Sequence, residues 1–312
     1  MVISQMPKSC KRRTRHRLMR RYWVYYVLFL PVVVYLIIFK YIPLAGIQIA
    51  FKDYNFLQGI WGSPWTSNYG LKHFIRFLTN GELPRLFKNT MTLSLLSIAI
   101  GFPAPIILAL LLNEMKWPRY KRVLQSISYL PHFVSFVVVY AILHNFFSYN
   151  GFINGVRRER IMYLGERGLY KWFYVLSSVW KGVGWGSIIY LAALSRVNVE
   201  LYEAAELDGA SRLQKLWHIT LSEIRPLISL QFIMTMGGLF STSFSQTLIM
   251  INDMVQPVAE TVDYYIYKTG VLKINQYSYS AAVGLFNSAL SLAMVVLTNR
   301  VAKKLDEDGG IW

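Results

Sequence analysis

Four polar side chains lie in a long apolar stretch near residue 240, where they could form hydrogen bonds to a polar ligand. They are Gln231, Thr235, Thr242 and Gln246, which follow one another at spacings of four, seven and four residues. At about 100° per residue, these spacings place all four on one stripe of a helix. Polar groups inside a membrane face the interior of a helical bundle or a water-filled cavity. The stripe therefore predicts either a polar pathway or hydrogen bonds between helices.

A lysine also lies in an apolar stretch, where an ionised group is costly. Lys181 is expected to face a cavity or a partner for this reason. The neighbouring Trp180 could stack on the ring of a ligand such as a sugar, although packing between helices explains it equally well. An anionic ligand would suit Lys181 and a second basic cluster, which consists of Arg157, Arg158 and Arg160.

The chain lacks the patterns that would make it an enzyme. No GxxxxGK[ST] phosphate loop, HExxH zinc helix or GxSxG nucleophile turn occurs in the 312 residues. Cys10 is the only cysteine, which excludes an internal disulfide and a CxxC site. The five histidines are scattered. We therefore expect no catalytic residue, no metal and no cofactor on this chain.

The elements that must position these residues are long apolar segments. Hydrophobic residues make up 54% of the chain and charged residues 16%, whereas a soluble domain carries about 25% charged residues. A helix needs roughly 20 mainly apolar residues to cross a bilayer. The pattern predicts an all-α, polytopic membrane protein with six transmembrane helices. Their expected bounds are Tyr22–Ile47, Phe87–Leu112, Val123–Phe147, Leu169–Leu194, Pro226–Ile251 and Ala281–Val301.

The distribution of positive charge predicts the orientation of these helices. Residues 1–21 carry eight Lys and Arg and no acidic residue, and such residues collect in the cytoplasmic segments of membrane proteins. Segments on that side carry 19 Lys and Arg, against 12 in the longer loops opposite. Both termini are therefore expected in the cytoplasm, and the net charge of +17 reflects this bias rather than nucleic-acid binding. The expected parts are a basic segment 1–21, a membrane domain 22–301 and a tail 302–312.

Several predicted spans contain residues that disturb a helix. Pro103 and Pro105 lie in the second, Pro131 in the third, and Gly237 with Gly238 in the fifth. Such breaks are tolerated in lipid where neighbouring protein or a water-filled cavity satisfies the freed backbone groups. Together they indicate helices built around a pathway. Close helix packing is the expected role of three glycines in the fourth span, Gly182, Gly184 and Gly186.

The polar segment between the fourth and fifth spans has the pattern of two short helices. The first is expected to end near Leu207, because Gly209 can adopt the left-handed conformation that stops a helix. Ser211 can begin the second, with Gln214 as its capping-box partner. One face of the second helix would suit a groove of a partner protein. The apolar residues of this face are Ala210, Leu213, Leu216 and Trp217. The second helix is expected to end near Trp217.

This segment resembles the EAA loop of the ABC importer permeases. The match covers Glu203-Ala204-Ala205, Asp208-Gly209-Ala210, Ile219, Leu221 and Pro226, in order and spacing. Trp217 departs from the usual Phe, and Ser222 from the usual Pro; Thr220 and Glu223 could form a capping box there instead. The resemblance implies that the loop, residues 196–225, docks onto a separate ATPase. The implied docking residues are Glu203, Ala204, Ala205, Asp208, Gly209, Ala210, Leu213, Leu216 and Trp217.

Further stretches resemble the permeases that import polysaccharides and oligosaccharides, over nearly the whole chain beyond Arg21. They are Phe39–Pro43, Ala50–Tyr54, Ser128–His132, Gly184–Ala193 and Ala281–Phe286. The resemblance implies a transport subunit, not an enzyme, that lies in the bacterial inner membrane and works by alternating access. Its implied partners are a second permease, two ATPase subunits that hold ATP and Mg²⁺, and an extracytoplasmic solute-binding protein. Alginate permeases belong to this group, so alginate is one candidate cargo.

Other classes of function stay open at this point. An ion-coupled secondary transporter would need acidic residues in the middle of a span, and none of the 16 Asp and Glu residues lies there. A membrane-embedded enzyme such as a glycosyltransferase would need paired carboxylates or a metal site at a membrane edge. Among importers, a phosphodiester or a peptide is an alternative cargo.

Overall fold

The computed structural model describes residues 22–158, 160–273 and 276–305. Within these ranges the regular structure is helical, apart from an isolated bridge between Lys52 and Trp65. The predicted all-α class is therefore confirmed for the described part of the chain. The predicted basic segment 1–21 and residues 306–312 of the predicted tail lie outside it.

Four helical stretches of the described residues are long and apolar enough to cross a bilayer. They are Trp23–Phe51, Leu83–Asn113, Phe136–Arg157 and Tyr277–Lys304. The chain is therefore a helical membrane protein. The helices at the predicted fourth and fifth spans are not among these four, so the count of six spans and the cytoplasmic position of both termini stay predictions.

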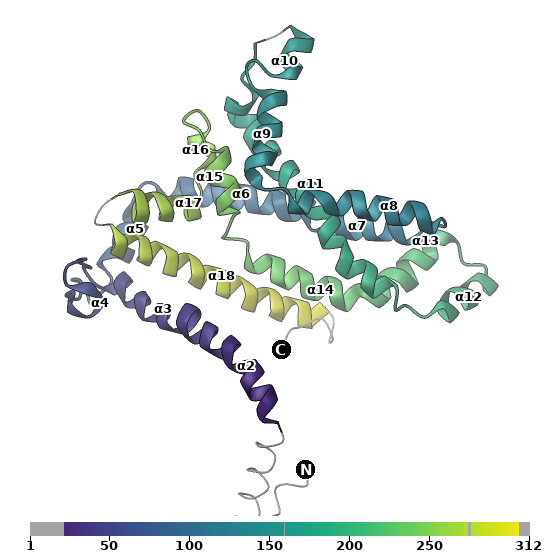
Figure 1. Ribbon diagram of the computed structural model, residues 1–312, viewed down its shortest axis with the longest axis horizontal. Coiled ribbons are helices and arrows are strands. Elements are labelled where there is room, and N and C mark those ends of the chain that lie inside the picture. The colour runs from purple at the N-terminus through teal and green to yellow at the C-terminus, as the bar shows by residue number, and fades with distance from the viewer. Residues whose placement is uncertain (1–21, 159, 274–275, 306–312) are drawn as a thin grey trace, which may run out of the picture.

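The first of these stretches stands apart from the other helices. It consists of α2 (Trp23–Leu36), the π-helix η1 (Ile37–Tyr41), α3 (Ile42–Leu44) and the 3₁₀ helix η2 (Ala45–Phe51). Figure 1 shows α2 diverging from the rest, and none of its residues is buried. Only the far end is anchored, where η2 packs against α18 (Tyr277–Leu305). The apolar surface of α2 therefore needs lipid or another subunit around it.

The centre of the molecule is a bundle around one long helix, α11 (Arg167–Leu194). It packs against α6 (Leu83–Gly101) and α7 (Pro103–Asn113), which meet at Phe102 next to Pro103. It also contacts α14 (Leu221–Gly237), which packs along α18. The predicted fourth span is thus the central helix, although it carries Lys181.

Two glycines allow neighbouring helices to approach α11 closely. A methyl group on Gly184 would overlap the carbonyl oxygen of Ser128, and one on Gly186 would lie 3.0 Å from Cγ of Pro105. The predicted packing role is therefore confirmed for both glycines. Gly182 has no atom within 4 Å of such a methyl group, so it has no packing role of this kind.

The third predicted span is not one straight helix. The chain forms α8 (Pro118–Tyr129), the 3₁₀ helix η3 (Leu130–Phe133) and α9 (Phe136–Phe147), with Val134 and Ser135 extended between them. Figure 1 shows α8 beside α7, whereas α9 rises away with α10 (Phe152–Arg157) at its tip. η4 (Tyr163–Gly165) then leads into α11. A single helix over Val123–Phe147 is therefore wrong, because Pro131 tightens the turn and Ser135 caps a new helix.

The fifth predicted span is also broken. α14 ends at Gly237, residues 238–243 are not helical, and α15 begins at Phe244 and ends at Met250. The prediction of one continuous helical stripe from Gln231 to Gln246 is therefore wrong. The two glycines cause the break as their sequence position indicated, since glycine weakens a helix interior.

Short helices form the end of the molecule around α5. They are α4 (Gly59–Gly62), α5 (Lys72–Thr79), α16 (Gln256–Ala259), α17 (Val262–Tyr267) and the π-helix η6 (Lys268–Leu272). A buried cluster that includes Phe77, Leu86, Val262 and Tyr279 joins α5, α6, α17 and α18. Figure 1 shows this end opposite α12 (Val199–Leu207) and α13 (Arg212–Lys215), which η5 (Leu216–Thr220) connects to α14. We call the end around α5 the outer end, meaning the end remote from α12 and α13.

A buried carboxylate stabilises the outer end. The Glu260 side chain is 1% exposed and pairs with Arg85 at 2.7 Å and Lys268 at 2.9 Å. Burial acts to raise the pKa of Glu260, but the hydrogen bonds from Lys268 and Arg85 outweigh it and hold that pKa below its ordinary value. The carboxylate is therefore charged at neutral pH, and it links α6 to α16 and η6.

Glu260→Gln is expected to destabilise the protein by about 1–3 kcal/mol, because Lys268 loses its carboxylate partner and Arg85 keeps only Glu82. A lowered pKa contributes stability above the ordinary Glu pKa of about 4.3, and that contribution is lost as pH falls through the folded-state pKa. Thermal melts of the detergent-solubilised protein should thus show a lower Tm for the variant at pH 7. Its acid dependence should be shallower than that of the wild type, and parallel curves would contradict this role.

Candidate functional site

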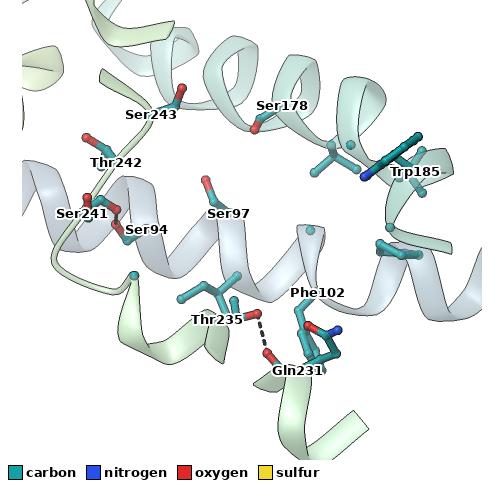
Figure 2. A pocket seen from close by; sticks show the side chains of 18 of the residues that line it. Ser94, Ser97, Phe102, Ser178, Trp185, Gln231, Thr235, Ser241, Thr242 and Ser243 are labelled. Carbon is teal, nitrogen blue, oxygen red and sulfur yellow. Dashed lines mark hydrogen bonds between the residues drawn. The ribbon is translucent and has the colours of Figure 1, made fainter. Parts of the chain in front are cut away.

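An open cavity of about 600 Å³ lies where α14 breaks, lined by α6, α7, α11, α14 and the non-helical residues after α14. Figure 2 shows hydroxyl groups from several helices gathered around this space, among them Ser97 on α6 and Ser178 on α11. The polar lining besides tyrosine consists of Ser94, Ser97, Ser178, Gln231, Thr235, Ser241, Thr242 and Ser243. Hydroxyl and amide groups both donate and accept, so the lining can match a ligand rich in hydroxyls.

The rest of the lining is aromatic and apolar. Phe102, Trp185 and Tyr190 contribute rings, and Trp185 is held by stacking on His132, with ring centroids 4.5 Å apart and planes at 7°. Among the described residues, no Asp, Glu, Lys, Arg or His lines the cavity. Apolar walls with a few convergent polar groups are typical of small-molecule sites.

Side chains of neighbouring segments form hydrogen bonds with the non-helical residues 241–243 beside the cavity. Oδ2 of Asp263 accepts from the backbone N–H of Thr242 at 2.7 Å and from Oγ of Ser241 at 3.2 Å. The backbone N–H of Ser243 donates to the hydroxyl of Tyr174 at 3.0 Å. Such substitutes for helical hydrogen bonds are what a break in a helix requires where the backbone lies among packed protein.

Three of the six predicted pathway residues line the cavity. They are Gln231, Thr235 and Thr242, brought together although no single helix carries them. Gln246 is fully buried elsewhere, and its amide donates to the carbonyl of Tyr174 at 2.7 Å and to Oγ of Ser177 at 3.1 Å. Gln246 therefore forms hydrogen bonds between α15 and α11, the second of the two roles predicted for the polar stripe.

The other two predicted pathway residues lie outside the cavity lining. Lys181 donates to the carbonyl of His132, and its ammonium lies 5.5 Å from the ring centre of Phe136. The ammonium group of Lys181 thus faces a hydrogen-bond partner, which is one of the two environments expected for it. Trp180 is 47% exposed and is not part of the lining.

Sequence reasoning missed the residues of α11 that line the cavity. Ser178, Gly182, Trp185 and Gly186 all do so. They follow at spacings of four, three and one, which is one face of a helix. This stripe of small residues with one tryptophan was the available signal.

The loop between α11 and α14 has the local structure that its residues predict. α12 ends at Leu207, Gly209 has φ +78°, and Ser211 and Gln214 form both halves of a capping box. These predictions are confirmed. α13 does not end near Trp217, however, but continues through the π-helix η5 into α14.

The expected capping box between Thr220 and Glu223 is wrong. Thr220 is in helical conformation, and its hydroxyl donates to the carbonyl of Lys215 at 3.3 Å. The helix needs no new start there, because it already continues from η5 into α14.

The α12–α13 corner presents apolar side chains to its surroundings. Leu207, Leu213 and Trp217 are 91%, 63% and 62% exposed. Lys215 pairs with Glu206 across the corner and holds the pKa of that carboxylate below its ordinary value. Of the other predicted docking residues, Glu203, Ala204, Asp208 and Gly209 are exposed, and Ala205, Ala210 and Leu216 are half-buried. Leu207 was missed, although it is the most exposed of the three.

Comparison with known proteins identifies the class of this molecule. A sequence profile of the inner membrane component of binding-protein-dependent transport systems matches residues 101–307. The chain belongs to this family. The permease is 41% identical to the polygalacturonan/rhamnogalacturonan transport system permease protein YteP of Bacillus subtilis (strain 168), over 97% of the chain and 94% of that protein. Its identity to LplB of the same organism is also 41%, over 94% and 92%.

Solved structures agree with this assignment. A crystal structure of a bacterial ABC transporter involved in the import of the acidic polysaccharide alginate contains a similar chain. The TM-score is 0.84 at 32% identity, covering 94% of the permease and 99% of that chain. A chain in the crystal structure of a bacterial alginate ABC transporter in complex with an alginate pentasaccharide-bound periplasmic protein is also similar, with a TM-score of 0.82 and 33% sequence identity. The predicted resemblance to polysaccharide permeases is confirmed.

Proposed function

We propose that the permease forms part of the transmembrane pathway of an ATP-driven importer for an acidic saccharide. The observation that carries this proposal is the uncharged, hydroxyl-lined cavity at the break of α14. The relatives add the class of cargo, since polygalacturonan and alginate are both acidic polysaccharides. Alginate is one candidate among them.

The lining suits passage rather than retention. A pathway must bind its cargo well enough to admit it and weakly enough to release it. Neutral hydroxyls such as Ser97 and Thr235 can exchange hydrogen bonds with successive sugar hydroxyls, while the rings of Phe102 and Trp185 offer faces for stacking. A cation in the cavity would hold a carboxylate more tightly, and the described lining contains none.

The proposal includes the rest of the assembly. The α12–α13 corner would seat in a groove of an ATPase through Leu207, Leu213 and Trp217. Two such ATPases would hold ATP and Mg²⁺, a second permease would complete the pathway, and a solute-binding protein would deliver the cargo. Six inner-membrane spans, with both termini in the cytoplasm, would place the corner on the ATPase side and the outer end on the delivery side.

Uptake of a defined acidic sugar tests the pathway. Gln231→Leu combined with Thr235→Val removes two polar groups from the lining. Uptake of tetragalacturonate by the complete importer in proteoliposomes should fall at least about fivefold, because each of the two lost hydrogen bonds contributes about 0.5–1.5 kcal/mol. Membrane abundance should be unchanged.

Met234→Leu is the matched control, because Met234 lies on the same helix and is 61% exposed. The control should transport normally. A wild-type importer that takes up no acidic saccharide would refute the proposed cargo. A double variant equal to the control would refute the pathway.

A further inference from the structure

A second cavity at the outer end is strongly polar. It has a volume of about 380 Å³ and lies between α5, the start of α6, α16, α17 and η6. Four cationic and two acidic side chains line it, which leaves two excess positive charges. They are Arg76, Arg85, Lys268, Lys273, Glu82 and Glu260. We call this cavity the outer pocket.

Two of the cations are held in place by carboxylates. Glu260 binds Arg85 and Lys268 through separate oxygens, at 2.7 and 2.9 Å, and Glu82 also pairs with Arg85. The side chains of Arg85 and Lys268 keep 34% and 31% of their surface exposed. Their remaining N–H donors are therefore positioned and accessible, so a ligand would not have to order them.

The other two cations have no carboxylate partner among the described residues. Arg76 instead lies over the ring of Tyr279, 4.4 Å from its centre. It also lines an adjoining cavity of about 350 Å³, and Gln276 borders both spaces. Unpaired positive charge beside a concave, polar surface attracts anions.

The outer pocket and the hydroxyl-lined cavity lie on two sides of one short segment. Glu260 faces the outer pocket. Asp263, three residues later, holds Ser241 and Thr242, which line the cavity. Thr261, between them, contacts the hydroxyl of Thr242 at 3.1 Å. A ligand in the outer pocket would thus be one chain segment away from the cavity.

We propose that the outer pocket binds the carboxylate groups of an acidic saccharide before the saccharide enters the uncharged cavity. This inference rests on the proposed function. Arg76 and Lys273 supply the net attraction, and Arg85 and Lys268 supply oriented donors. The two cavities would thus have different roles. Positive charge in the outer pocket would select the acidic cargo, and the neutral hydroxyls of the uncharged cavity would let it pass.

A carboxylate of the solute-binding protein is the alternative partner for these cations. The shape of the pocket favours the saccharide, because the donors lie within a concave cavity rather than on a flat rim. The adjoining cavity shares Arg76 and Gln276, which extends the surface in the manner that an oligomer requires.

The test uses Arg76→Gln combined with Lys273→Gln in the complete importer. Equilibrium binding of tetragalacturonate to the purified assembly, without the solute-binding protein, should weaken about tenfold, because each charged contact contributes a few-fold. The uptake rate at saturating binding protein should fall by a similar factor. Lys88→Gln is the matched control, since Lys88 is an exposed cation on α6 that does not line the pocket, and it should change neither quantity.

Two further measurements separate the explanations. Arg76→Lys with Lys273→Arg keeps the charges and should restore both quantities to within about threefold. The affinity of the binding protein for the assembly should be the same in wild type and variant. Unchanged tetragalacturonate binding, failure of the charge-preserving variant, or a proportional loss of binding-protein affinity would each overturn the inference. If the wild type binds tetragalacturonate through these residues but does not transport it, the proposed function fails and the pocket stands.

Discussion

Replacing Gly209 with proline is expected to abolish transport while the permease still accumulates in the membrane. Gly209 has φ +78°, and its N–H donates to the carbonyl of Glu206 at 3.1 Å. Proline fixes φ near −65° and has no N–H, so it can adopt neither feature. The turn between α12 and α13 would change shape, and with it the placement of the exposed Leu207 and Leu213 relative to each other.

A graded series at the same position isolates the backbone requirement. Asparagine tolerates the left-handed conformation, so Gly209→Asn should keep most of the transport activity. Alanine costs about 1–2 kcal/mol there and should give an intermediate effect. No atom lies within 4 Å of a methyl group at this position, so steric overlap does not confuse the result.

Two measurements check the series: saccharide uptake, and co-purification of the ATPase with the permease. Both should decline from glycine through asparagine and alanine to proline. Normal uptake by Gly209→Pro would contradict the proposed docking corner. So would a proline variant that loses uptake yet retains the ATPase and its stimulated hydrolysis.

Gly184→Ala is expected to prevent stable folding, although it adds only one methyl group. That methyl group would overlap the carbonyl oxygen of Ser128, which belongs to the backbone of α8. A backbone cannot move aside as a flexible side chain can, so α8 and α11 would have to separate along their contact. Overpacking typically costs about 1–3 kcal/mol and more where the neighbouring atoms cannot move, which is a large fraction of the stability of a protein.

The same helix offers a matched control. Gly182→Ala lies two residues away and meets nothing within 4 Å. Alanine is about 1 kcal/mol more favourable than glycine inside a helix, so this variant should be neutral or slightly stabilised. Membrane abundance and the Tm of the detergent-solubilised protein should separate the two variants. Equal stability would show that α8 does not pack against Gly184 as described.

The local structure of the loop between α11 and α14 could be predicted from the sequence because its causes are local. The stop at Gly209 and the capping box of Ser211 and Gln214 depend on residues within one or two turns of each other. The all-α class followed from the apolar segments for a similar reason. One local expectation was wrong, at Thr220, because a potential cap gains nothing where the helix already continues.

Only the tertiary structure decided which polar residues meet. Gln231 and Thr242 line one cavity because the chain breaks and turns between them, whereas Gln246, on the same predicted stripe, bonds to α11. Lys181 donates to the carbonyl of His132 in η3, a contact that no spacing in the sequence indicates. The outer pocket joins Arg76 to Lys273 across almost 200 residues. Helix periodicity determines which face a side chain occupies, but the packing of distant segments determines what that face meets.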